Sequence, residues 1–499
     1  MSRVPDEPIG GRVAAIVSAL RDTNLLVSDA LTAPVELAGI CDDSRAVVPG
    51  GLFVAVRGSA LDGHEFIAAA RSSGAALVIA EDAARASGGP ALIVRDARRA
   101  AAVAAAAFYR QPGAGVRLVA VTGTNGKTTT VGMLRHLLDD GATRAASIGT
   151  LGVLFGSEGA AVDGGAGLTT PGPIELQRVL RVLADRGARF VAMEVSSHSL
   201  AQHRIEGVRF DAAVFTNLTR DHLDYHGTMD AYRDAKLSLA MHLAPEAVAI
   251  VNADEPAWGS LASQVRTLTF GAGATADVRA EDIDYGPEGT RFRLVTPGGT
   301  ADVMLPLIGD FNVSNALGAV AAATELGVPT PVLAARIATM PQVVGRLERI
   351  GAQPTVLRDY AHTPDALERA LLALRPFVRG RIIVVFGAGG DRDPGKRPLM
   401  GAVAARLADV AIVTSDNPRT EDPERIIDAI VSAMPVGGYE RIEDRREAIA
   451  RAIAIADSAN DLVLLAGKGH ETYQVRGTAK LPFDEAEIAA ELMTARSNR

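Results

Sequence analysis

The sequence is poor in cysteine and in long apolar runs. Cys41 is the one cysteine among 499 residues, which excludes a disulfide framework within the chain and argues against a cysteine-built zinc site. Such usage is typical of a protein of the reducing cytoplasm. The longest apolar run, Ala100–Tyr109, is too short for a membrane helix of ~20 residues. Residues Met1–Gly11 carry acids and prolines without an apolar segment, so we expect no signal peptide and no membrane insertion.

An excess of positive charge is also missing. The formal net charge is −8, whereas nucleic-acid-binding proteins usually present a basic face. The composition therefore argues against nucleic acid as the main partner. The composition does not exclude small anionic substrates, because their binding requires only a local basic site. We expect a cytoplasmic, monomeric protein that acts on small molecules.

The length predicts about three domains, at roughly 100–200 residues each. Hydrophobic residues make up 48% of the chain, enough for each domain to have its own core. We place the domains at residues 1–97, 98–344 and 345–499. The loop signal Gln111–Gly115 lies near the start of the second, and the third follows the segment Val343-Val-Gly-Arg346.

Apolar segments alternate with helix-like segments, which predicts an α/β fold with parallel sheets covered on both faces. The first domain is a small α/β domain, the second a parallel-sheet domain of the phosphate-loop type, and the third a Rossmann-like domain. Ligands of such open sheets bind at the carboxyl ends of the strands. Residues Gly271–Pro306 predict β-rich insertion or edge structure. The predicted strands are Leu52–Val56, Ala76–Ile79, Ala91–Val94, Val116–Val121, Phe190–Val195, Ala212–Phe215, Val248–Val251, Thr355–Arg358, Ile382–Phe386, Val410–Val413 and Leu462–Leu465.

A phosphate-binding loop, Gly123-Thr-Asn-Gly-Lys-Thr-Thr129, stands between a predicted strand and a predicted helix at Thr128–Asp140. Glycines let backbone N–H groups approach phosphate oxygens, and the helix N-terminus adds partial positive charge. Lys127 adds a full charge, and the Thr128 hydroxyl can bind magnesium. The spacing is two residues shorter than in the general phosphate loop. The candidate nucleotide residues here are Gly123, Thr124, Asn125, Gly126, Lys127, Thr128 and Thr129.

Two further side chains indicate metal-nucleotide chemistry. Glu194 ends an apolar strand, and His222 closely follows another. A carboxylate and an imidazole at strand ends can bind Mg²⁺ directly or through water. Each alone is more often a hydrogen-bonded structural residue, but a phosphate loop in the same domain favours the metal interpretation.

With these motifs the chain resembles the Mur ligases, which build the peptide of bacterial peptidoglycan, over essentially its whole length. The resemblance is greatest to the members that add meso-2,6-diaminopimelate to UDP-N-acetylmuramoyl-L-alanyl-D-glutamate. It implies ATP and Mg²⁺ as cofactors. It also implies transfer of the ATP γ-phosphoryl group to a substrate carboxylate, followed by attack of an amine on the acyl phosphate.

The resemblance implies roles for residues that the pattern alone leaves unassigned. Lys236, in Tyr-Arg-Asp-Ala-Lys236, matches a lysine that the family carbamylates, and a carbamate can serve as a metal ligand. Thr128, Glu194 and His222 complete the implied magnesium site, and Lys127, Glu194, His222 and Lys236 are the implied catalytic set. Further residues implied near the nucleotide are Asn312, Asn315, Arg346 and Asp359.

The resemblance also implies where the UDP-sugar dipeptide binds. The uridine pocket corresponds to Ser44, Ser59, Ala60 and Leu61. The clamp on the sugar and peptide corresponds to Thr169, Thr170, Ser196, Gln202 and Arg204. Hydroxyls, an amide and a guanidinium are suitable donors to diphosphate and carboxylate oxygens.

The implied acceptor site is in the third domain, at Asp416-Asn-Pro-Arg419. Family members that use diaminopimelate have this arginine, whereas lysine-adding members lack it. Diaminopimelate carries a distal carboxylate that an arginine can bind bidentately, and lysine does not. The implied acceptor residues are Arg392, Asp416, Asn417, Pro418, Arg419, Gly467 and Glu471.

Three other functions compete with this interpretation. An L-lysine-adding, other Mur or folylpolyglutamate-type ligase would keep the ATP chemistry and change the substrates. A non-catalytic nucleotide-binding protein would be expected to lack part of the set Lys127, Glu194, His222 and Lys236. A mononucleotide kinase would not need the third domain.

Overall fold

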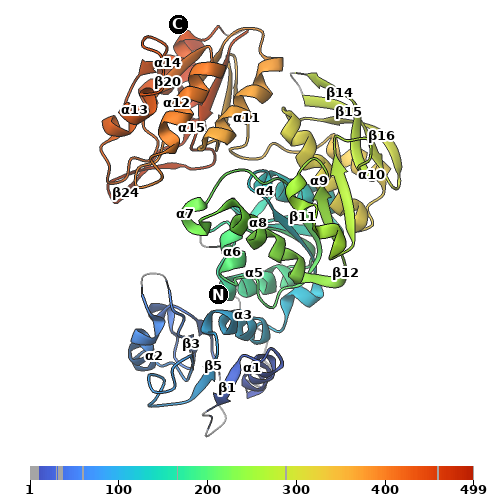
Figure 1. Cartoon of the computed structure of the whole chain (residues 1–499), viewed down its shortest axis with the longest axis vertical. Coiled ribbons are helices and arrows are strands. Elements are labelled where there is room, and N and C mark those ends of the chain that lie inside the picture. The colour runs from blue at the N-terminus through green and yellow to red at the C-terminus, as the bar shows by residue number, and fades with distance from the viewer. Residues whose placement is uncertain are drawn as a thin grey trace. The chain divides into compact units, whose positions relative to one another are not determined.

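The chain folds into two compact units, whose elements are labelled in Figure 1. The computed structural model describes residues 10–29, 31, 37–58, 61–165, 167–286, 289–457 and 460–497. Unit 1 comprises residues 1–269 and 318–327, and unit 2 comprises residues 270–317 and 328–499. Within the described ranges, each helix lacks the length or the apolar character needed to cross a bilayer.

Unit 1 begins with a small α/β sheet. Its elements are α1 (Gly10–Asp22), β1 (Leu26–Asp29), β2 (Ile40–Cys41), β3 (Leu52–Val54), α2 (Ile67–Ser72), β4 (Leu77–Ala80), β5 (Ala91–Val94) and α3 (Ala97–Phe108). The strand order is β1-β5-β4-β3-β2, with β1 antiparallel and the others parallel. Leu52 and Val54 face α1 and α3, while Phe53 faces α2, as the alternation of side chains along a strand requires.

A larger sheet follows in unit 1. Its elements are β6 (Arg117–Thr122), α4 (Lys127–Leu138), β7 (Arg144–Gly149), β8 (Gly152–Phe155), β9 (Ala160–Val162), α5 (Pro173–Asp185), β10 (Ala188–Glu194), α6 (Ser197–Ala201), β11 (Phe210–Phe215), α7 (Leu223–His226), α8 (Met229–Leu237), β12 (Leu243–Asn252) and β13 (Thr267–Gly271). The strands run in the order β13-β12-β11-β6-β10-β7-β8-β9. From β12 to β7 they are parallel, and β8 and β9 form an antiparallel edge.

Unit 2 contains an antiparallel meander and a second parallel sheet. Its elements are β14 (Val278–Gly286), β15 (Gly289–Thr296), β16 (Gly299–Leu305), part of α9 (Asp310–Glu325), α10 (Thr330–Ile337), β17 (Glu348–Ala352), β18 (Thr355–Asp359), α11 (Pro364–Leu374), β19 (Ile382–Phe386), α12 (Lys396–Leu407), β20 (Val410–Val413), α13 (Pro423–Val431), β21 (Glu440–Arg441), α14 (Arg445–Ile455), β22 (Leu462–Ala466), β23 (Tyr473–Arg476), β24 (Ala479–Pro482) and α15 (Glu485–Ser497). Strands β14, β15 and β16 form the meander.

The parallel sheet of unit 2 has the order β17-β18-β22-β19-β20-β21 and is parallel except for β17. Helices α11, α12 and α13 pack on one face, against side chains that include Val384 and Leu464. Helices α14 and α15 pack on the other face, against Ile383 and Val463. This two-sided burial explains why these strands have continuous apolar sequences.

The structure confirms the predicted α/β class and the predicted strands, with ends shifted by a few residues. Residues 271–306 are β-rich, as predicted. The sequence does not predict β7, because Arg-Ala-Ala-Ser-Ile-Gly lacks a run of β-branched residues. The domain borders at 97/98 and 344/345 stay a prediction, since the two compact units divide the chain elsewhere.

A buried arginine holds two strand ends at the carboxyl edge of the sheet in unit 2. Arg445 is 1% exposed and forms an ion pair of 2.8 Å with Glu485. Its guanidinium also donates to the carbonyl of Ala466, which ends β22, and to that of Ser415, just after β20. Further hydrogen bonds help to offset the cost of burying an ion pair, and the Arg445 guanidinium has these two. Arg445 thus fixes the starts of two loops.

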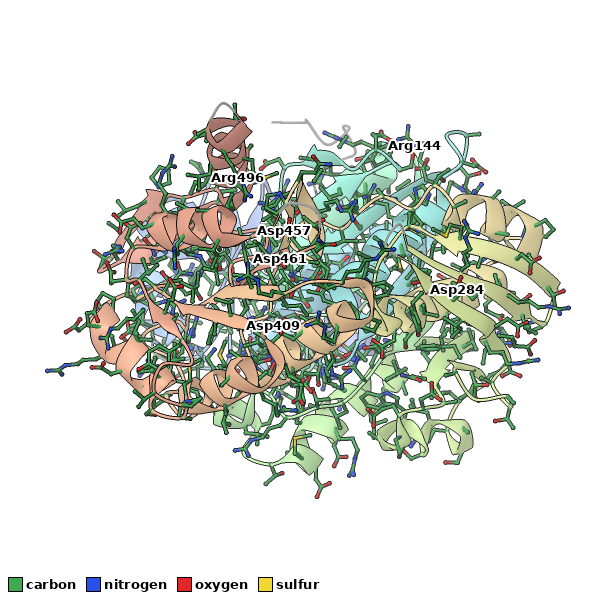
Figure 2. The ribbon with its side chains drawn as sticks, turned by 90° about the horizontal axis from the view of Figure 1, so that it is seen from above. Arg144, Asp284, Asp409, Asp457, Asp461 and Arg496 are labelled. Atoms are coloured by element: carbon green, nitrogen blue, oxygen red, sulfur yellow. The ribbon has the colours of Figure 1, made fainter. Side chains whose placement is uncertain are left out.

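Aspartates lie at the amino ends of the same strands. Asp409 and Asp461, labelled in Figure 2, accept the backbone N–H groups of Ile382 and Arg381, each at 2.7 Å. The Arg381 guanidinium also pairs with Asp461 at 2.7 Å. Burial acts to raise the pKa of Asp461, but two backbone N–H groups and the guanidinium together hold it below its ordinary value. The ionised carboxylate therefore stabilises the fold.

We expect Asp461→Asn to lower the free energy of unfolding by about 1.5–3 kcal/mol at pH 7, the range for hydrogen bonds to a charged group. Because the folded state lowers this pKa, the stabilisation is complete above the ordinary carboxyl pKa of about 4 and is lost as the pH falls below it. Denaturant unfolding followed by circular dichroism at pH 7 and at about pH 3.5 measures the difference.

The matched control is Asp185→Asn. Asp185 is exposed and forms an ion pair with Arg181 one helical turn away, so its loss should change the free energy of unfolding by about 0.5 kcal/mol or less. A gap between wild type and Asp461→Asn that stays constant in acid would contradict the assignment.

Candidate active site

The phosphate loop connects β6 to α4, and its glycines are required by geometry. Gly123 has φ 148° and Gly126 has φ 85°, both in the region that side chains disfavour. A Cβ on Gly123 would lie 1.9 Å from Oγ1 of Thr216. The Thr216 hydroxyl donates to the Asn125 carbonyl at 2.7 Å. The loop is therefore packed closely against the end of β11.

Two lysines converge on the carbonyl of Gly123. Lys127 Nζ donates to the carbonyls of Gly123 at 3.0 Å and Thr124 at 2.8 Å. Lys236 Nζ, from α8, donates to Gly123 at 2.7 Å and is 1% exposed. Burial lowers the pKa of Lys236 well below its ordinary value, and the charge of Lys127 adds to this effect. A lysine that loses its proton readily can act as a nucleophile toward CO₂.

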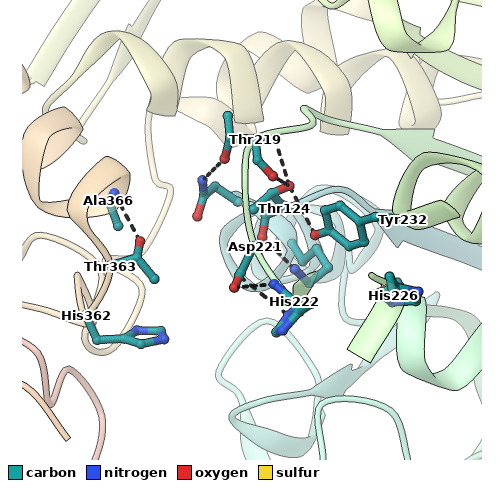
Figure 3. A network of polar contacts seen from close by, with 12 residues as sticks. Thr124, Thr219, Asp221, His222, His226, Tyr232, His362, Thr363 and Ala366 are labelled. Carbon is teal, nitrogen blue, oxygen red and sulfur yellow. Dashed lines mark hydrogen bonds and ion pairs between the residues drawn. The ribbon is translucent and has the colours of Figure 1, made fainter. Parts of the chain in front are cut away.

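A polar network surrounds the same loop (Figure 3). Thr124 Oγ1 lies 3.1 Å from the hydroxyl of Tyr232 and donates to the carbonyl of Thr219. Asp221 and His222 follow, with His222 Nε2 3.5 Å from the Asp221 carboxylate. Burial lowers the pKa of His222, Asp221 opposes this effect, and Lys127 and Lys236 reinforce it. The imidazole is thereby favoured in its neutral, metal-binding form.

Glu194 ends β10 as predicted and is 1% exposed. Its carboxylate accepts the N–H of Thr150 at 2.8 Å and the Thr150 hydroxyl at 3.2 Å. A Cβ on Gly149 would lie 2.2 Å from Glu194 Oε1, so glycine is needed beside the carboxylate. Thr150 Oγ1 also lies 3.2 Å from Thr169 Oγ1, which joins Glu194 to the predicted substrate clamp.

The predicted clamp residues lie together in unit 1. Thr170 Oγ1 donates to the Glu194 carbonyl at 2.9 Å and accepts the N–H of Ser196 at 3.1 Å. Arg204 donates to the Thr170 carbonyl at 2.9 Å and to Gln202 Oε1 at 2.7 Å. This half-buried guanidinium beside the strand end is suited to binding an anionic group.

The predicted magnesium ligands are distributed over four elements of unit 1. Within the described residues, no group of three or more His, Cys, Asp or Glu side chains could hold a metal ion by itself. Such a group is not required, because Mg²⁺ usually binds one or two carboxylates together with substrate phosphates and water. Glu194 and the Thr128 hydroxyl fit that chemistry. Lys236 fits it only as a carbamate, since an amine offers no oxygen ligand.

The predicted uridine pocket is described only in part. Ser44 follows β2, and Leu61, which is 63% exposed, follows β3. These two strands pair in parallel, so both residues lie beyond the same edge of the sheet. Ser59 and Ala60 lie outside the described residues.

The residues predicted to reach the nucleotide from elsewhere belong to unit 2. Asn312 and Asn315 are buried on α9, with an amide contact of 3.4 Å between them. Asp359, at the end of β18, accepts the N–H groups of Leu347 and Ala361. Burial raises the pKa of Asp359, although Arg346 and these N–H groups act in the opposite direction. The Arg346 guanidinium lies over the ring of Tyr360, 4.8 Å from its centre.

The predicted acceptor loop follows β20 and is buried at Asp416, Asn417 and Pro418. Asn417 Nδ2 donates to Glu471 Oε2 at 2.8 Å, which brings the second predicted acceptor segment beside the first. A Cβ on Gly467, where φ is 119°, would lie 3.6 Å from the Asp416 carboxylate. Burial raises the pKa of Glu471.

Arg419 has φ 52°, and its guanidinium donates to the carbonyl of Gly390 at 2.6 Å. Gly390 follows β19, and a Cβ there would lie 1.9 Å from the Pro418 carbonyl oxygen. Arg392 is exposed in the same segment. The glycine-rich segment after β19, which lacks dinucleotide-binding spacing, therefore supports the arginine of the acceptor loop.

Sequence reasoning did not single out four residues that hold these groups in place. Thr150, Tyr232, Arg445 and Lys468 each lie outside the predicted binding sets, although Lys468 directly follows the predicted acceptor residue Gly467. A lysine in a glycine-rich segment directly after an apolar strand was the available signal for Lys468. For Thr150 and Arg445 no local signal exists, because their partners are more than 20 residues away.

Comparison with known families gives three matches along the chain. Residues 36–111 match the Mur ligase family catalytic domain, residues 121–323 the Mur ligase middle domain, and residues 345–469 the Mur ligase glutamate ligase domain. The phosphate loop, Glu194 and Lys236 lie in the second match, and the acceptor loop lies in the third.

Curated relatives are similar over nearly the full length. A UDP-N-acetylmuramoyl-L-alanyl-D-glutamate–2,6-diaminopimelate ligase of Gloeobacter violaceus is 46% identical over 475 residues, covering 93% of this chain and 95% of the relative. The ligase of the same name from Geobacter sulfurreducens is 45% identical over 482 residues, covering 91% and 94%.

Solved structures give the same result for the fold. One of a UDP-N-acetylmuramoyl-L-alanyl-D-glutamate–2,6-diaminopimelate ligase has a TM-score of 0.68 at 35% identity, covering 94% of this chain and 98% of that one. A Mycobacterium tuberculosis folylpolyglutamate synthase shares the fold, with a TM-score of 0.63 at 19% identity over 73% of this chain and 91% of that one. The chain belongs to the Mur ligase family and is an ATP-dependent ligase of peptidoglycan precursor synthesis.

Proposed function

We propose that the protein joins meso-2,6-diaminopimelate to the free glutamate carboxylate of UDP-N-acetylmuramoyl-L-alanyl-D-glutamate. The carrying observation is the acceptor loop, where the charges of both Arg419 and Asp416 act on the carboxylate of Glu471. A distal carboxylate of the acceptor would pair with Arg419, and its distal ammonium with the acids. L-Lysine has no such carboxylate and would place an ammonium near the arginine. Relatives of 46% and 45% identity carry the name of this activity.

The proposed reaction has two steps. The γ-phosphoryl group of ATP moves to the glutamate carboxylate, giving ADP and an acyl phosphate. The acceptor amine then attacks the carbonyl carbon, the C–N bond forms, the bond to phosphate breaks, and the nitrogen loses a proton. Backbone N–H groups of the loop after β6, with Lys127, would bind the phosphate oxygens. Asn312, Asn315, Arg346 and Asp359 would complete the nucleotide site.

We propose Mg²⁺ at Thr128, Glu194 and His222, with Lys236 carbamylated. The bound ion would neutralise phosphate charge. Carbamylation joins the neutral Lys236 amine to CO₂ and releases a proton, so that a neutral side chain becomes an anion. The low pKa of Lys236 supports this step, because the neutral amine is the reactive form. The carbamate nitrogen keeps one N–H for the Gly123 carbonyl.

The donor would be bound at its two ends. Ser44, Ser59, Ala60 and Leu61 would bind the uridine. Thr169, Thr170, Ser196, Gln202 and Arg204 would bind the sugar and peptide part. We place the reaction in the cytoplasm of a cell with peptidoglycan and propose a monomer, since one chain supplies every proposed residue.

The purified protein should release phosphate from ATP only when the UDP-dipeptide and meso-diaminopimelate are both present. Replacing the acceptor by L-lysine should lower kcat/KM by at least about tenfold, because one charge-assisted interaction is lost. Coupled phosphate release and mass spectrometry of the product measure this. Equal turnover with L-lysine would overturn the acceptor, and no turnover with either would overturn the ligation itself.

Arg419→Ala should raise KM for meso-diaminopimelate by about 10- to 100-fold, which corresponds to about 1.5–3 kcal/mol for a hydrogen-bonded charge. KM for ATP and for the UDP-dipeptide should not change. The control is Arg425→Ala, which removes the same charge from an exposed position on α13. A rise in KM for ATP instead would assign Arg419 another role.

Lys236→Ala should abolish turnover, and acetate or another short carboxylic acid should restore part of it by supplying the missing carboxylate. Wild-type activity should not respond to the acid. Gentle-ionisation mass spectrometry of the intact wild type should show the added mass of one CO₂, absent from the variant. An unmodified, fully active wild type would rule out the carbamate.

A further inference from the structure

Lys468 is a buried cation beside the acceptor loop. It follows β22 and Gly467, and its side chain is fully buried. Its Nζ lies 3.6 Å from Asp416 Oδ1 and 3.7 Å from Glu471 Oε2. It donates to Asn417 Oδ1 at 3.1 Å and to the carbonyl of Tyr473 at 2.7 Å. Burial lowers the pKa of Lys468, and the charges of Asp416 and Glu471 act in the opposite direction. The four oxygens around its nitrogen favour an ammonium rather than a neutral amine.

These contacts fix the orientation of the Asn417 amide. Its Oδ1 accepts from Lys468 Nζ and from the N–H of Val475 at 2.9 Å. Its Nδ2 donates to Glu471 Oε2 at 2.8 Å. A reversed amide would place its NH₂ against an ammonium and an N–H group, so the ammonium excludes it. Lys468 thereby determines which group Asn417 presents to Glu471.

The charges of the buried and half-buried groups in direct contact around Lys468 balance. Asp416 and Glu471 contribute two negative charges, and Lys468 and Arg419 contribute two positive charges. Two further cations have acids of their own nearby, since Arg445 pairs with Glu485 and the exposed Arg392 acts on Asp391. Asp416 Oδ1 is buried without a hydrogen-bond partner in the described part of the chain. A buried carboxylate oxygen in that state is strongly unfavourable unless a cation or donor approaches it. Lys468 is the neighbouring cation, and Asp416 still has capacity for a donor from a ligand.

We propose that Lys468 is a positioning residue that keeps the acceptor pocket electrically neutral, and so makes it select an amino acid whose distal end is a zwitterion. This inference rests on the proposed function. A distal carboxylate near Arg419 and a distal ammonium near Asp416 and Glu471 add no net charge to a neutral pocket. Without Lys468 the pocket carries one negative charge and favours an acceptor whose distal end is only an ammonium.

Lys468→Met tests this by removing the charge and keeping the approximate size. The ratio of kcat/KM for meso-diaminopimelate to that for L-lysine should fall by about tenfold or more, as expected for one lost charge-assisted interaction. The change should lie in KM for the acceptor, with KM for ATP unchanged. Lys468→Arg, which keeps the charge, should retain more of the ratio than Lys468→Met.

Lys480→Met is the matched control. Lys480 lies on β24, is exposed and contacts the ring of Tyr473, so the same substitution removes a charge a short distance away. It should leave the ratio unchanged. A purely structural role for Lys468 would lower the thermal midpoint and kcat with all acceptors equally. An unchanged ratio in a folded Lys468→Met protein would therefore overturn the proposal.

A second measurement needs no variant and tests the charge balance of the pocket even if Lys468→Met does not fold. The wild type is assayed with 2-aminopimelate, which has the distal carboxylate but no distal ammonium, and with L-lysine, which has the reverse. Each should have a KM at least about tenfold above that of meso-diaminopimelate, because each adds net charge to a neutral pocket. If KM for 2-aminopimelate equalled KM for meso-diaminopimelate, the proposal that the pocket is electrically neutral would be wrong. A wild type inactive with meso-diaminopimelate would instead refute the proposed function.

Discussion

Buried cations bound to backbone carbonyls hold the carboxyl ends of the parallel strands, and the candidate sites depend on them. Lys236 binds the carbonyl of Gly123 after β6, and Arg445 binds those of Ser415 and Ala466 after β20 and β22. A strand end leaves carbonyl groups that the next strand no longer pairs, and a buried carbonyl must find a donor. A cation supplies several donors at once and so fixes the loop where ligands of such sheets bind.

The amino ends of the same strands use the opposite charge. Asp211 accepts the N–H of Leu118 at the start of β6, and Asp461 accepts that of Arg381 just before β19. Donors are left over where strands begin, and carboxylates satisfy them. The sheets are therefore anchored at both edges by ionised side chains. The predicted site residues lie at the carboxyl ends of the strands, where glycines let backbone and side chains approach closely, as at Gly123 and Gly149.

In unit 1, one hydrogen-bonded route joins the predicted donor clamp to the predicted metal ligand. Thr169 contacts Thr150, Thr150 binds Glu194, and Thr170 binds the Glu194 carbonyl. A carboxylate held by a threonine at a strand end has few orientations available. This rigidity suits phosphoryl transfer, in which positioning and charge stabilisation provide most of the catalysis. In unit 2, Lys468 and Asn417 provide the same kind of restraint in the predicted acceptor loop.

The α/β class, the phosphate loop and most of the strands can be predicted from the sequence, because these depend on local patterns of apolar residues and glycine. The motif Asp416–Arg419 was also visible, since its residues are contiguous. The contacts of Thr150, Arg445 and Lys468 are visible only in the tertiary structure. Their partners come from distant strands and helices, so burial and charge pairing arise only when the chain is folded. A lone lysine in a sequence is ordinarily a solvated charge, and the fold alone makes Lys236 and Lys468 buried ones.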